Sequence, residues 1–326
     1  MNRSPLERVF VAGHRGMVGS ALVRRLEKAG AGEVVVCGRD ELDLTRQADV
    51  ESFFGDRRIG LVYLAAARVG GIKANRDRPA DFIRENLQIQ TNVIDAAHRS
   101  GVQRLMFLGS SCIYPREAAQ PMREDALMTG TLEPTNDAYA VAKIAGIKMC
   151  EAYHRQHGSD FRSAMPTNLY GPNDNFDLET SHVLPALLRR FQQAATAGEK
   201  GVGVWGSGRP RREFLHVDDM ASATCHLAEL SAERYWSSVH SHCSHVNVGC
   251  GEDISIAELA ALMARITGFT GSIEFDDSMP DGTPRKLLDV GKLKGMGWEA
   301  RIGLEQGIRQ THEWMLNHWT EISANG

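Results

Sequence analysis

The sequence contains no apolar stretch of the roughly 18 to 20 residues that a bilayer-spanning helix needs. The segment before Arg8 also lacks the order of basic, apolar and small residues that marks a secretory signal. An excess of positive charge is absent too, since 37 Lys and Arg residues stand against 41 Asp and Glu residues, for a formal net charge of -4. These absences predict a soluble, cytoplasmic protein that binds neither membranes nor nucleic acid.

The six cysteines are irregularly spaced and include no Cys-x-x-Cys pair, so we expect individual thiols in a reducing compartment rather than a disulfide framework. Internal repeats and low-complexity segments are absent as well. Histidine and cysteine do gather in one short segment, as His240, His242, Cys243 and His245. Because their spacing fits no standard metal site, we predict that the protein binds no metal.

At 326 residues, of which 42% are hydrophobic and 24% charged, the chain is long enough for one large α/β domain or two packed ones. From Arg8 onward, short β-rich runs alternate with amphipathic helical stretches, a pattern typical of a parallel sheet with helices on both faces. The strands are predicted at 9–12, 34–37, 61–65, 104–108 and 163–169, and the helices at 18–28, 47–54, 81–100 and 138–157. We therefore predict an α/β fold with a doubly wound parallel sheet of the Rossmann type.

The pattern loosens after Pro172. We predict a helix at 186–193, a strand leading into a helix over 212–230, a strand at 246–248 and a helix at 256–267. The glycine-rich residues 201–208 are predicted to form loops that cover a ligand, and residues 281–285 a surface loop. The second half is expected to interleave with the first rather than to fold separately.

Three glycines, Gly13, Gly16 and Gly19, follow the first predicted strand directly and open the first predicted helix. Glycines at this spacing allow backbone N–H groups to approach a pyrophosphate at the positive end of a helix. A glycine triplet alone would also fit a tight turn. Its position between a strand and a helix favours a dinucleotide site.

The end of the second predicted strand bears on which dinucleotide binds, because an acidic residue there would contact the ribose hydroxyls of NAD. The sequence has Arg39 at this place, with Arg15 available in the glycine loop. A guanidinium group can bind a 2′-phosphate bidentately, so NADP is favoured. The alternative is that Arg39 is a solvated loop residue. Asp43 could bond the adenine amino group or cap a helix.

Tyr139 and Lys143 lie four residues apart, which places them on one face of a predicted helix. An adjacent cation favours the phenolate, so this pair could exchange a proton with a carbonyl or hydroxyl oxygen. The same spacing is often only structural. Beside a dinucleotide site, the catalytic interpretation gains weight.

Ser110 and Cys112 follow the predicted strand 104–108, at the sheet edge where ligands bind. In an extended chain alternate residues face one way, so both side chains are expected to point into the pocket, with Ser110 on the same oxygen as Tyr139. A turn start at Ser110 and an inert, apolar Cys112 are the alternatives.

On these motifs the chain resembles the extended short-chain dehydrogenase/reductases and, more narrowly, the GDP-L-fucose synthases, across almost its whole length. The glycine loop and the Tyr-x-x-x-Lys pair are shared across that superfamily. More specific are Ser-Ser-Cys-Ile-Tyr-Pro (110–115), Asn-Leu-Tyr-Gly-Pro (168–172) and Ser-His-Val (181–183), and Pro-Asp-Gly-Thr-Pro-Arg-Lys (280–286) is a further match. Residues 235–244 match nothing in the family pattern.

The resemblance implies NADPH-dependent conversion of the nucleotide sugar GDP-4-keto-6-deoxy-D-mannose into GDP-L-fucose, by epimerisation at C3 and C5 and reduction at C4. It implies that Ser110, Tyr139 and Lys143 serve the C4 oxygen and that Cys112 and His182 serve the epimerisations. The chemistry agrees, because C3 and C5 both adjoin the ketone and inversion needs an acid and a base. A thiol with a pKa of about 8.5 and an imidazole with one of about 6.5 bracket neutral pH.

The resemblance also assigns binding residues and a homodimer formed by the helices at 81–100 and 138–157. Residues 1–172, with return segments near 212–248, would bind NADP, and 173–211 with 249–326 would form a smaller, interleaved substrate-binding domain. The substrate contacts are expected at Arg190, Trp205, Arg212 and Asp281, although a surface cation, a packing aromatic or a turn would also explain such residues. The cofactor contacts are expected at Gly13, Arg15, Gly16, Met17, Val18, Gly19, Arg39, Leu108, Gly109, Ser110, Ser111, Lys143, Pro166, Asn168, Leu169 and His182.

Two other functions are compatible with parts of this pattern. A 4-epimerase or a 4,6-dehydratase would share the fold, but residues 111–113 carry no carboxylate where the dehydratases have Thr-Asp-Glu, and Arg39 disfavours the NAD of the epimerases. A non-catalytic NADP-sensing protein would not need Ser110, Tyr139 and Lys143 together. The reductase is therefore favoured.

Overall fold

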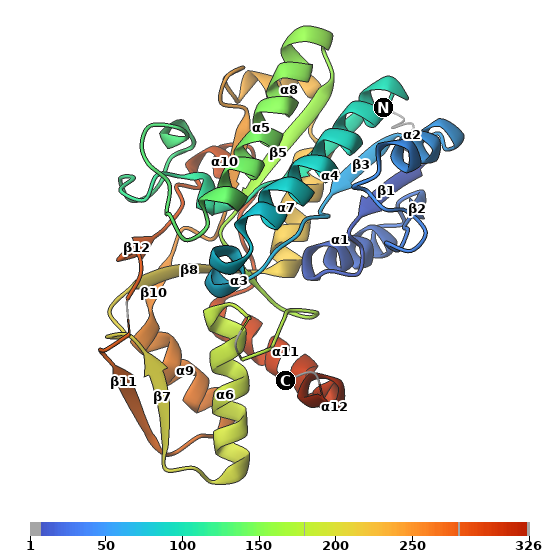
Figure 1. Ribbon diagram of the computed structural model, residues 1–326. Helices are drawn as coiled ribbons and strands as arrows, with labels where there is room; N and C mark the ends of the chain where they lie inside the picture. Colours follow the sequence, from blue (N-terminus) through green and yellow to red (C-terminus); the bar gives the residue numbers. More distant parts are fainter. Residues whose placement is uncertain (1–7, 179, 280, 325–326) are drawn as a thin grey trace.

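The computed structural model describes residues 8–178, 180–279 and 281–324. Its central sheet contains six parallel strands in the order β2-β1-β3-β4-β5-β9 (Figure 1). The strand order reverses between β1 and β3, and such a reversal opens a crevice at the carboxyl ends of the strands. The predicted doubly wound parallel sheet is confirmed. Its strands are β1 (Arg8–Ala12), β2 (Glu33–Val35), β3 (Leu61–Leu64), β4 (Arg104–Leu108), β5 (Asp160–Pro166) and β9 (His245–Val248).

Both faces of this sheet are buried, because successive residues of a strand point to opposite sides and both sides are covered by helices. In β1, Val9 and Val11 pack into one apolar core, whereas Phe10 and Ala12 pack into another. The first core is covered by α1 (Met17–Lys28) and α7 (Val217–Glu229), and the second by α2 (Gln47–Asp56), α4 (Pro79–Arg99) and α5 (Asp137–His157).

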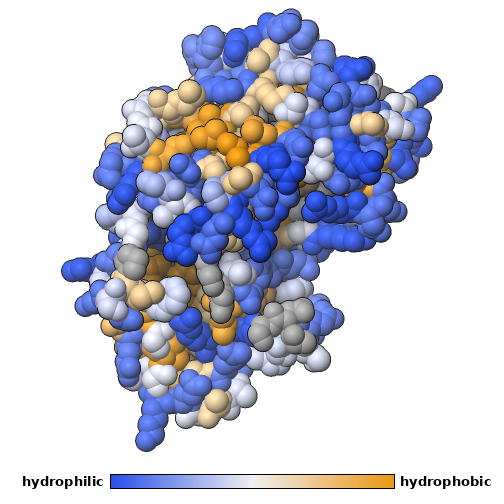
Figure 2. Space-filling view, in the orientation of Figure 1, coloured by the Kyte–Doolittle hydropathy of each residue, from blue (hydrophilic) through white to orange (hydrophobic). Residues whose placement is uncertain are grey.

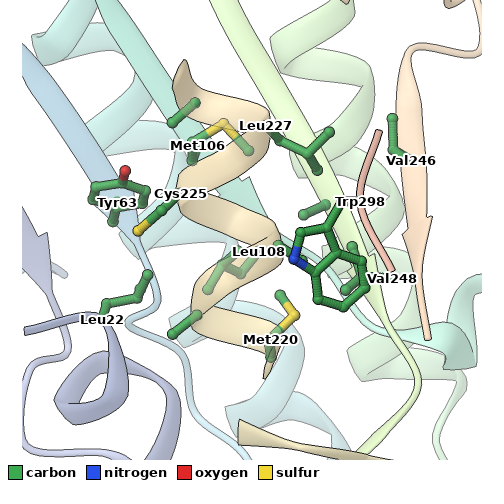
Figure 3. Packing of buried hydrophobic residues seen from close by; sticks show 14 of the residues in the cluster. Leu22, Tyr63, Met106, Leu108, Met220, Cys225, Leu227, Val246, Val248 and Trp298 are labelled. Carbon is green, nitrogen blue, oxygen red and sulfur yellow. The ribbon is translucent and has the colours of Figure 1, made fainter. Parts of the chain in front are cut away.

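The first core joins the two halves of the chain. Figure 3 shows Met220 and Cys225 of α7 beside Leu22 of α1 and Leu108 of β4, all of which are buried. Trp298, close to the C-terminus, packs into the same cluster. The second half of the chain therefore contributes β9 to the central sheet and α7 to the layer that covers it.

A smaller lobe lies below the central sheet in Figure 1. There β8 (Arg211–His216) runs parallel to β6 (Asn168–Tyr170) and β12 (Arg285–Lys286) and antiparallel to β10 (Asp253–Ser255). A third apolar core is enclosed by α6 (Val183–Ala197), α9 (Ile256–Thr267), α11 (Leu304–Asn317) and α12 (Trp319–Ala324). Because β6 follows β5 almost at once, the chain passes directly from the large sheet to the small one.

The prediction of loops at 201–208 is wrong for the first five of these residues. They form β7 (Gly201–Trp205), which pairs in parallel with β11 (Ser272–Asp276). Val202 and Val204 are buried while Gly203 and Trp205 are exposed, which is the alternation of a strand with one buried face. Two glycines among five residues obscured that alternation in the sequence.

Other differences lie at element boundaries and in elements that were not predicted. The predicted strand at 163–169 divides into β5 and β6, and the predicted helix at 186–193 extends over all of α6. The unpredicted elements are the 14-residue helix α11, α12, β10, β11, β12, α3 (Ile72–Asp77), α8 (Ala232–Ser237), α10 (Gly291–Gly295) and the 3-10 turns η1 (Ser111–Ile113) and η2 (Glu124–Ala126). None of the described helices is long and apolar enough to cross a membrane.

Candidate active site

A cleft of about 920 Å³ lies at the carboxyl edge of the central sheet. Residues that directly follow or end β1, β3, β4 and β5 line it, among them Gly13, Ala65, Leu108 and Pro166. This is the crevice expected from the reversal of strand order. All sixteen residues predicted to contact a cofactor line the cleft: Gly13, Arg15, Gly16, Met17, Val18, Gly19, Arg39, Leu108, Gly109, Ser110, Ser111, Lys143, Pro166, Asn168, Leu169 and His182.

The glycine loop between β1 and α1 needs glycine for steric reasons. Gly13 has a φ of +86°, and a Cβ atom there would lie 2.7 Å from the amide nitrogen of Ala66. A Cβ atom on Gly19 would lie 2.0 Å from the carbonyl oxygen of Gly13. No side chain caps the first turn of α1, so its N–H groups remain available to an anion. These features fit the pyrophosphate of a dinucleotide.

Two arginines flank the far end of the cleft, after β2. The guanidinium of Arg15 lies over Gly38, where a Cβ atom would come 2.9 Å from its Nη2 atom. The next residue is Arg39, whose side chain is exposed. Glu41 does not neutralise Arg39 through an ion pair, and instead its carboxylate accepts a hydrogen bond from Gly38 N at 2.7 Å.

Asp43 also lines this end of the cleft. Its Oδ1 atom accepts hydrogen bonds from the hydroxyl and the amide of Thr45, at 2.7 and 3.0 Å, and these bonds lower the pKa of Asp43. The alternative that Asp43 caps a helix is wrong, because α2 begins at Gln47 with Arg46 in the N-cap position.

Tyr139 and Lys143 lie on α5 beside the end of β4. The Lys143 ammonium donates to the carbonyl oxygen of Leu108 at 2.7 Å and lies 5.8 Å from the centre of the Tyr139 ring. Burial lowers the pKa of Lys143 to about 8. Burial raises the pKa of Tyr139, and a hydrogen bond with Ser110 acts in the opposite direction. We expected the neighbouring ammonium to lower the pKa of Tyr139, but burial raises that pKa by more.

Ser110 connects Tyr139 to Cys112. Its hydroxyl accepts a hydrogen bond from the backbone N–H of Cys112 at 3.5 Å, and it lies close enough to the phenol and the thiol to lower the pKa of both. The expectation of an extended chain here is wrong, because Ser110 is the N-cap of the 3-10 turn η1, which contains Cys112. The turn nonetheless brings the two side chains together. Burial raises the pKa of Cys112, whereas Ser110 and the ammonium groups of Lys286 and Lys143 lower it.

His182 is the N-cap residue of α6, at the edge of the cleft. Desolvation lowers its pKa, and the ammonium of Lys286 lowers it further. Lys286 in β12 thus acts on both Cys112 and His182, and it pairs in register with Arg212 of β8. In the sequence, Lys286 is the last residue of the motif at 280–286, and that position alone did not indicate a role.

The four expected substrate contacts lie in the smaller lobe, outside the lining of the cleft. Burial lowers the pKa of Arg212 and the carboxylate of Asp281 raises it. Asp281 accepts two hydrogen bonds from Ser207, each 2.7 Å long. Trp205 is 65% exposed at the end of β7, and Arg190 donates to the carbonyl oxygen of Gly203 at 2.9 Å. Residues 281–285 of the predicted loop are described, whereas Pro280 of the family motif lies outside the described residues.

Residues 235–244, which matched no family pattern, cover part of α5. Tyr235 of α8 is buried and donates to the carbonyl oxygen of Ser244 at 2.7 Å. Lys148 and Arg155 of α5 donate to carbonyl oxygens of the same segment. Within the described part of the chain, no group of three or more His, Cys, Asp or Glu side chains is arranged to hold a metal ion.

The NAD dependent epimerase/dehydratase family matches residues 9–249. The GDP-L-fucose synthase of Escherichia coli (strain K12) is 57% identical over 312 residues, which cover 96% of this chain and 97% of that protein. GDP-L-fucose synthase 1 of Arabidopsis thaliana is 56% identical over 95% of this chain and 94% of its own. The chain belongs to the GDP-L-fucose synthases of this family.

Solved structures agree with this membership. A GDP-L-fucose synthetase from Naegleria fowleri bound to NADP superposes with a TM-score of 0.85 at 26% identity, over 98% of this chain and 97% of that one. A GDP-6-OMe-4-keto-L-xylo-heptose reductase from C. jejuni superposes with a TM-score of 0.91 at 36% identity, over 98% of this chain and 100% of that one. The family match and the NADP-bound relative support a nicotinamide cofactor.

Proposed function

We propose that this protein converts GDP-4-keto-6-deoxy-D-mannose into GDP-L-fucose with NADPH, through epimerisation at C3 and C5 and reduction at C4. The observation that carries the proposal is the hydroxyl of Ser110, which lies beside both Tyr139 and Cys112 and lowers the pKa of each. The group that would hold the C4 oxygen therefore adjoins the thiol that would act at a neighbouring carbon. One ketone position can then serve both reactions.

NADP is preferred over NAD in this proposal because of the two arginines at the end of β2. Arg15 and Arg39 both line the cleft on either side of Gly38, where the ribose of the adenosine would lie. Two guanidinium groups suit a 2′-phosphate and offer no acceptor to a free 2′-hydroxyl. The NADP-bound relative from Naegleria fowleri supports the same choice.

In the epimerisations, Ser110 and Tyr139 would donate hydrogen bonds to the C4 ketone and stabilise the enolate that forms when a proton leaves C3 or C5. Cys112 and His182 would remove that proton and return one to the opposite side. Burial raises the pKa of Cys112 and lowers that of His182, which favours a protonated thiol that can give a proton and a neutral imidazole that can accept one, while Lys286 lowers both pKa values. Each inversion moves one proton onto the imidazole and one off the thiol, so proton exchange with solvent, or a second inversion in the opposite sense, restores both groups.

In the reduction, bound NADPH would supply the hydride that C4 receives. The raised pKa of Tyr139 keeps its phenol protonated, so it can give that proton to the C4 oxygen. Lys143, held by Leu108, has a pKa of about 8 and can replace the lost proton near neutral pH. The pair thereby acts as a relay between the sugar oxygen and solvent.

The smaller lobe would hold the rest of the nucleotide sugar. Arg212 and Lys286 pair across β8 and β12, and two cations there suit a diphosphate. The exposed indole of Trp205 suits a base or sugar face, with Arg190 and Asp281 nearby as polar contacts. We retain the expected division into an NADP-binding part, 1–172 with segments near 212–248, and a substrate-binding part, 173–211 with 249–326, except that β6 and β8 pair with each other in the sheet of the smaller lobe.

The proposal includes a homodimer and a cytoplasmic location. Figure 2 shows apolar side chains gathered on the upper part of one face, where Figure 1 places α5. Val141 of α5 is 44% exposed, and α4 and α5 lie side by side as the two long helices that would form such a contact. Light scattering after gel filtration tests the dimer directly.

The decisive experiment supplies the 4-keto nucleotide sugar and NADPH to the purified protein. NADPH oxidation is followed at the nicotinamide absorbance band, and the sugar product is identified by NMR. Formation of GDP-L-fucose with equimolar NADPH consumption supports the proposal. Reduction without inversion at C3 and C5, or cofactor binding without turnover, contradicts it.

A further inference from the structure

Glu213 is a fully buried carboxylate at the junction of the two lobes, and none of the roles above uses it. Its Oε1 atom accepts a hydrogen bond from Gly251 N at 2.7 Å, and its Oε2 atom accepts one from Leu288 N at 2.9 Å. Burial raises the pKa of Glu213, and these hydrogen bonds oppose that effect. The carboxylate thus joins the loop after β9 to the chain just beyond β12.

The surrounding backbone is shaped to admit this carboxylate. A Cβ atom on Gly249 would lie 2.2 Å from Oε1 of Glu213, so no other residue fits there without displacing it. Gly251, whose N–H is one of the donors, has a φ of +79°, which glycine adopts readily. Two glycines from the end of β9 therefore form a close-fitting receptor for one side chain of β8.

The backbone of Glu213 also contacts the cofactor cleft. Its carbonyl oxygen accepts from the Asn168 amide at 2.8 Å and from the Thr167 hydroxyl at 3.4 Å, and both of these residues line the cleft. On the other side, Leu288 lies two residues beyond Lys286, and Arg212 is the neighbour of Glu213 in β8. A single residue is therefore bonded to the wall of the cofactor cleft and to the strand that carries Lys286.

The position of Lys286 affects both residues that are proposed to carry out the epimerisations. Its ammonium lowers the pKa of Cys112, which lies in η1, and of His182, which is the N-cap of α6. The pKa of Lys286 itself is lowered by Arg212 of β8 and raised by Glu133, which precedes α5. Coulomb interactions fall with distance, so a small withdrawal of Lys286 would weaken its effect on both groups. Lys143 of α5 also lowers the pKa of Cys112, but its ammonium is held by the carbonyl oxygen of Leu108 and does not depend on the position of β12.

We propose that Glu213 is a positioning residue that fixes the strand bearing Lys286, together with Arg212, at the distance from the cofactor cleft that epimerisation requires. This inference rests on the proposed function. An amide in place of the carboxylate would turn an NH₂ group toward a backbone N–H, leaving one buried donor without an acceptor. The chain beyond β12 would then move away, and Lys286 with it.

The test is Glu213→Gln in the full-length protein. The KM for the nucleotide sugar should rise about tenfold, as expected for the loss of one buried hydrogen bond to a charged group, while the Kd for NADPH changes less than about twofold. The pH profile of solvent-deuterium uptake at C3 and C5 should shift to higher pH, because Lys286 lowers the pKa of both Cys112 and His182.

Glu151→Gln is the matched control. Glu151 is also buried, at 1% exposure, and accepts a hydrogen bond from a backbone amide, Ser244 N, but it lies toward the far end of α5. This variant should lose thermal stability without a change in KM or in the pH profile. If Glu213→Gln behaves in the same way, the positioning role is overturned.

Gly249→Ala provides a second route to the same displacement if Glu213→Gln fails to fold. It keeps the carboxylate but pushes it from its receptor, so the same rise in KM and the same shift of the profile are expected, and wild-type values would overturn the proposal. GDP binding measured by calorimetry separates a failure of the proposed function from a failure of the positioning role of Glu213. If wild type binds GDP but makes no GDP-L-fucose, the proposed function fails, and weaker GDP binding by Glu213→Gln would still support the positioning role.

Discussion

The Lys143 ammonium donates a hydrogen bond to the carbonyl oxygen of Leu108, 2.7 Å away, at the last residue of β4. The contact ties α5 to the central sheet, but it holds a cation that is only 4% exposed. Burial lowers the pKa of Lys143 from 10.5 to about 8. The folded state therefore binds fewer protons than the unfolded state between these two values, so stability rises with pH across that window.

Lys143→Met should therefore separate stability from activity. The shift corresponds to a cost on the order of 3 kcal/mol at pH 7 for keeping the ammonium charged, partly offset by its bond to Leu108. We expect the free energy of unfolding at pH 7 to stay within about 1 kcal/mol of wild type or to increase, while turnover falls at least about 100-fold. Urea denaturation and steady-state kinetics measure the two effects. A large loss of stability would show that the bond to Leu108 outweighs the desolvation.

Cys112→Ser tests the assignment of the thiol to proton transfer. The hydroxyl is a far weaker acid than the thiol, so solvent-deuterium uptake at C3 and C5 should fall at least about 100-fold. NADPH binding should remain, because Ser110, Tyr139 and Lys143 are unchanged. Cys150→Ser, at a buried cysteine of α5 without a role in the reaction, is the control. Undiminished deuterium uptake by Cys112→Ser would remove the thiol from the mechanism.

The parts of the site that the sequence predicted are local in the chain. Gly13 to Gly19 form a turn between one strand and one helix, and Tyr139 and Lys143 share one helix, so short-range spacing determines their placement. Lys286 and Glu213 could not be found in this way. They approach each other only because β12 pairs with β8, more than 70 residues apart in the chain, as the bond between Glu213 and Leu288 shows (a separation of 75 residues).

Local errors had local causes. The alternation of Val202 and Val204 is a strand signal, but the glycines around it are also loop signals, and pairing with β11 decides between them. At Ser110 the side chain accepts from the backbone of Cys112 and starts a 3-10 turn, so the rule for extended chains did not apply. In both cases the sequence allowed two structures and a specific contact selected one.

Leu22→Ala tests the core that joins the two halves of the chain. Leu22 is fully buried in α1 and belongs to the cluster that includes Tyr63 and Cys225 (Figure 3). Truncation should lower the free energy of unfolding by about 2 to 5 kcal/mol. Val36→Ala, at a residue that is 39% exposed, should cost less than about 1 kcal/mol. Equal losses in thermal or urea unfolding would contradict the predicted importance of this core.

Arg39→Ala tests the preference for NADPH. A guanidinium that binds the 2′-phosphate contributes about 1.5 to 3 kcal/mol, so the Kd for NADPH should rise roughly 10- to 100-fold. NADH lacks that phosphate, and its Kd should change less than about twofold. Arg46→Ala removes a cation at the start of α2 that does not line the cleft, and it should leave both affinities unchanged. Fluorescence titration of each variant with each cofactor gives the four constants. If Arg39→Ala weakens both cofactors equally, Arg39 contacts a part that they share, and Arg15 remains to be tested as the 2′-phosphate ligand by the same titration of Arg15→Ala.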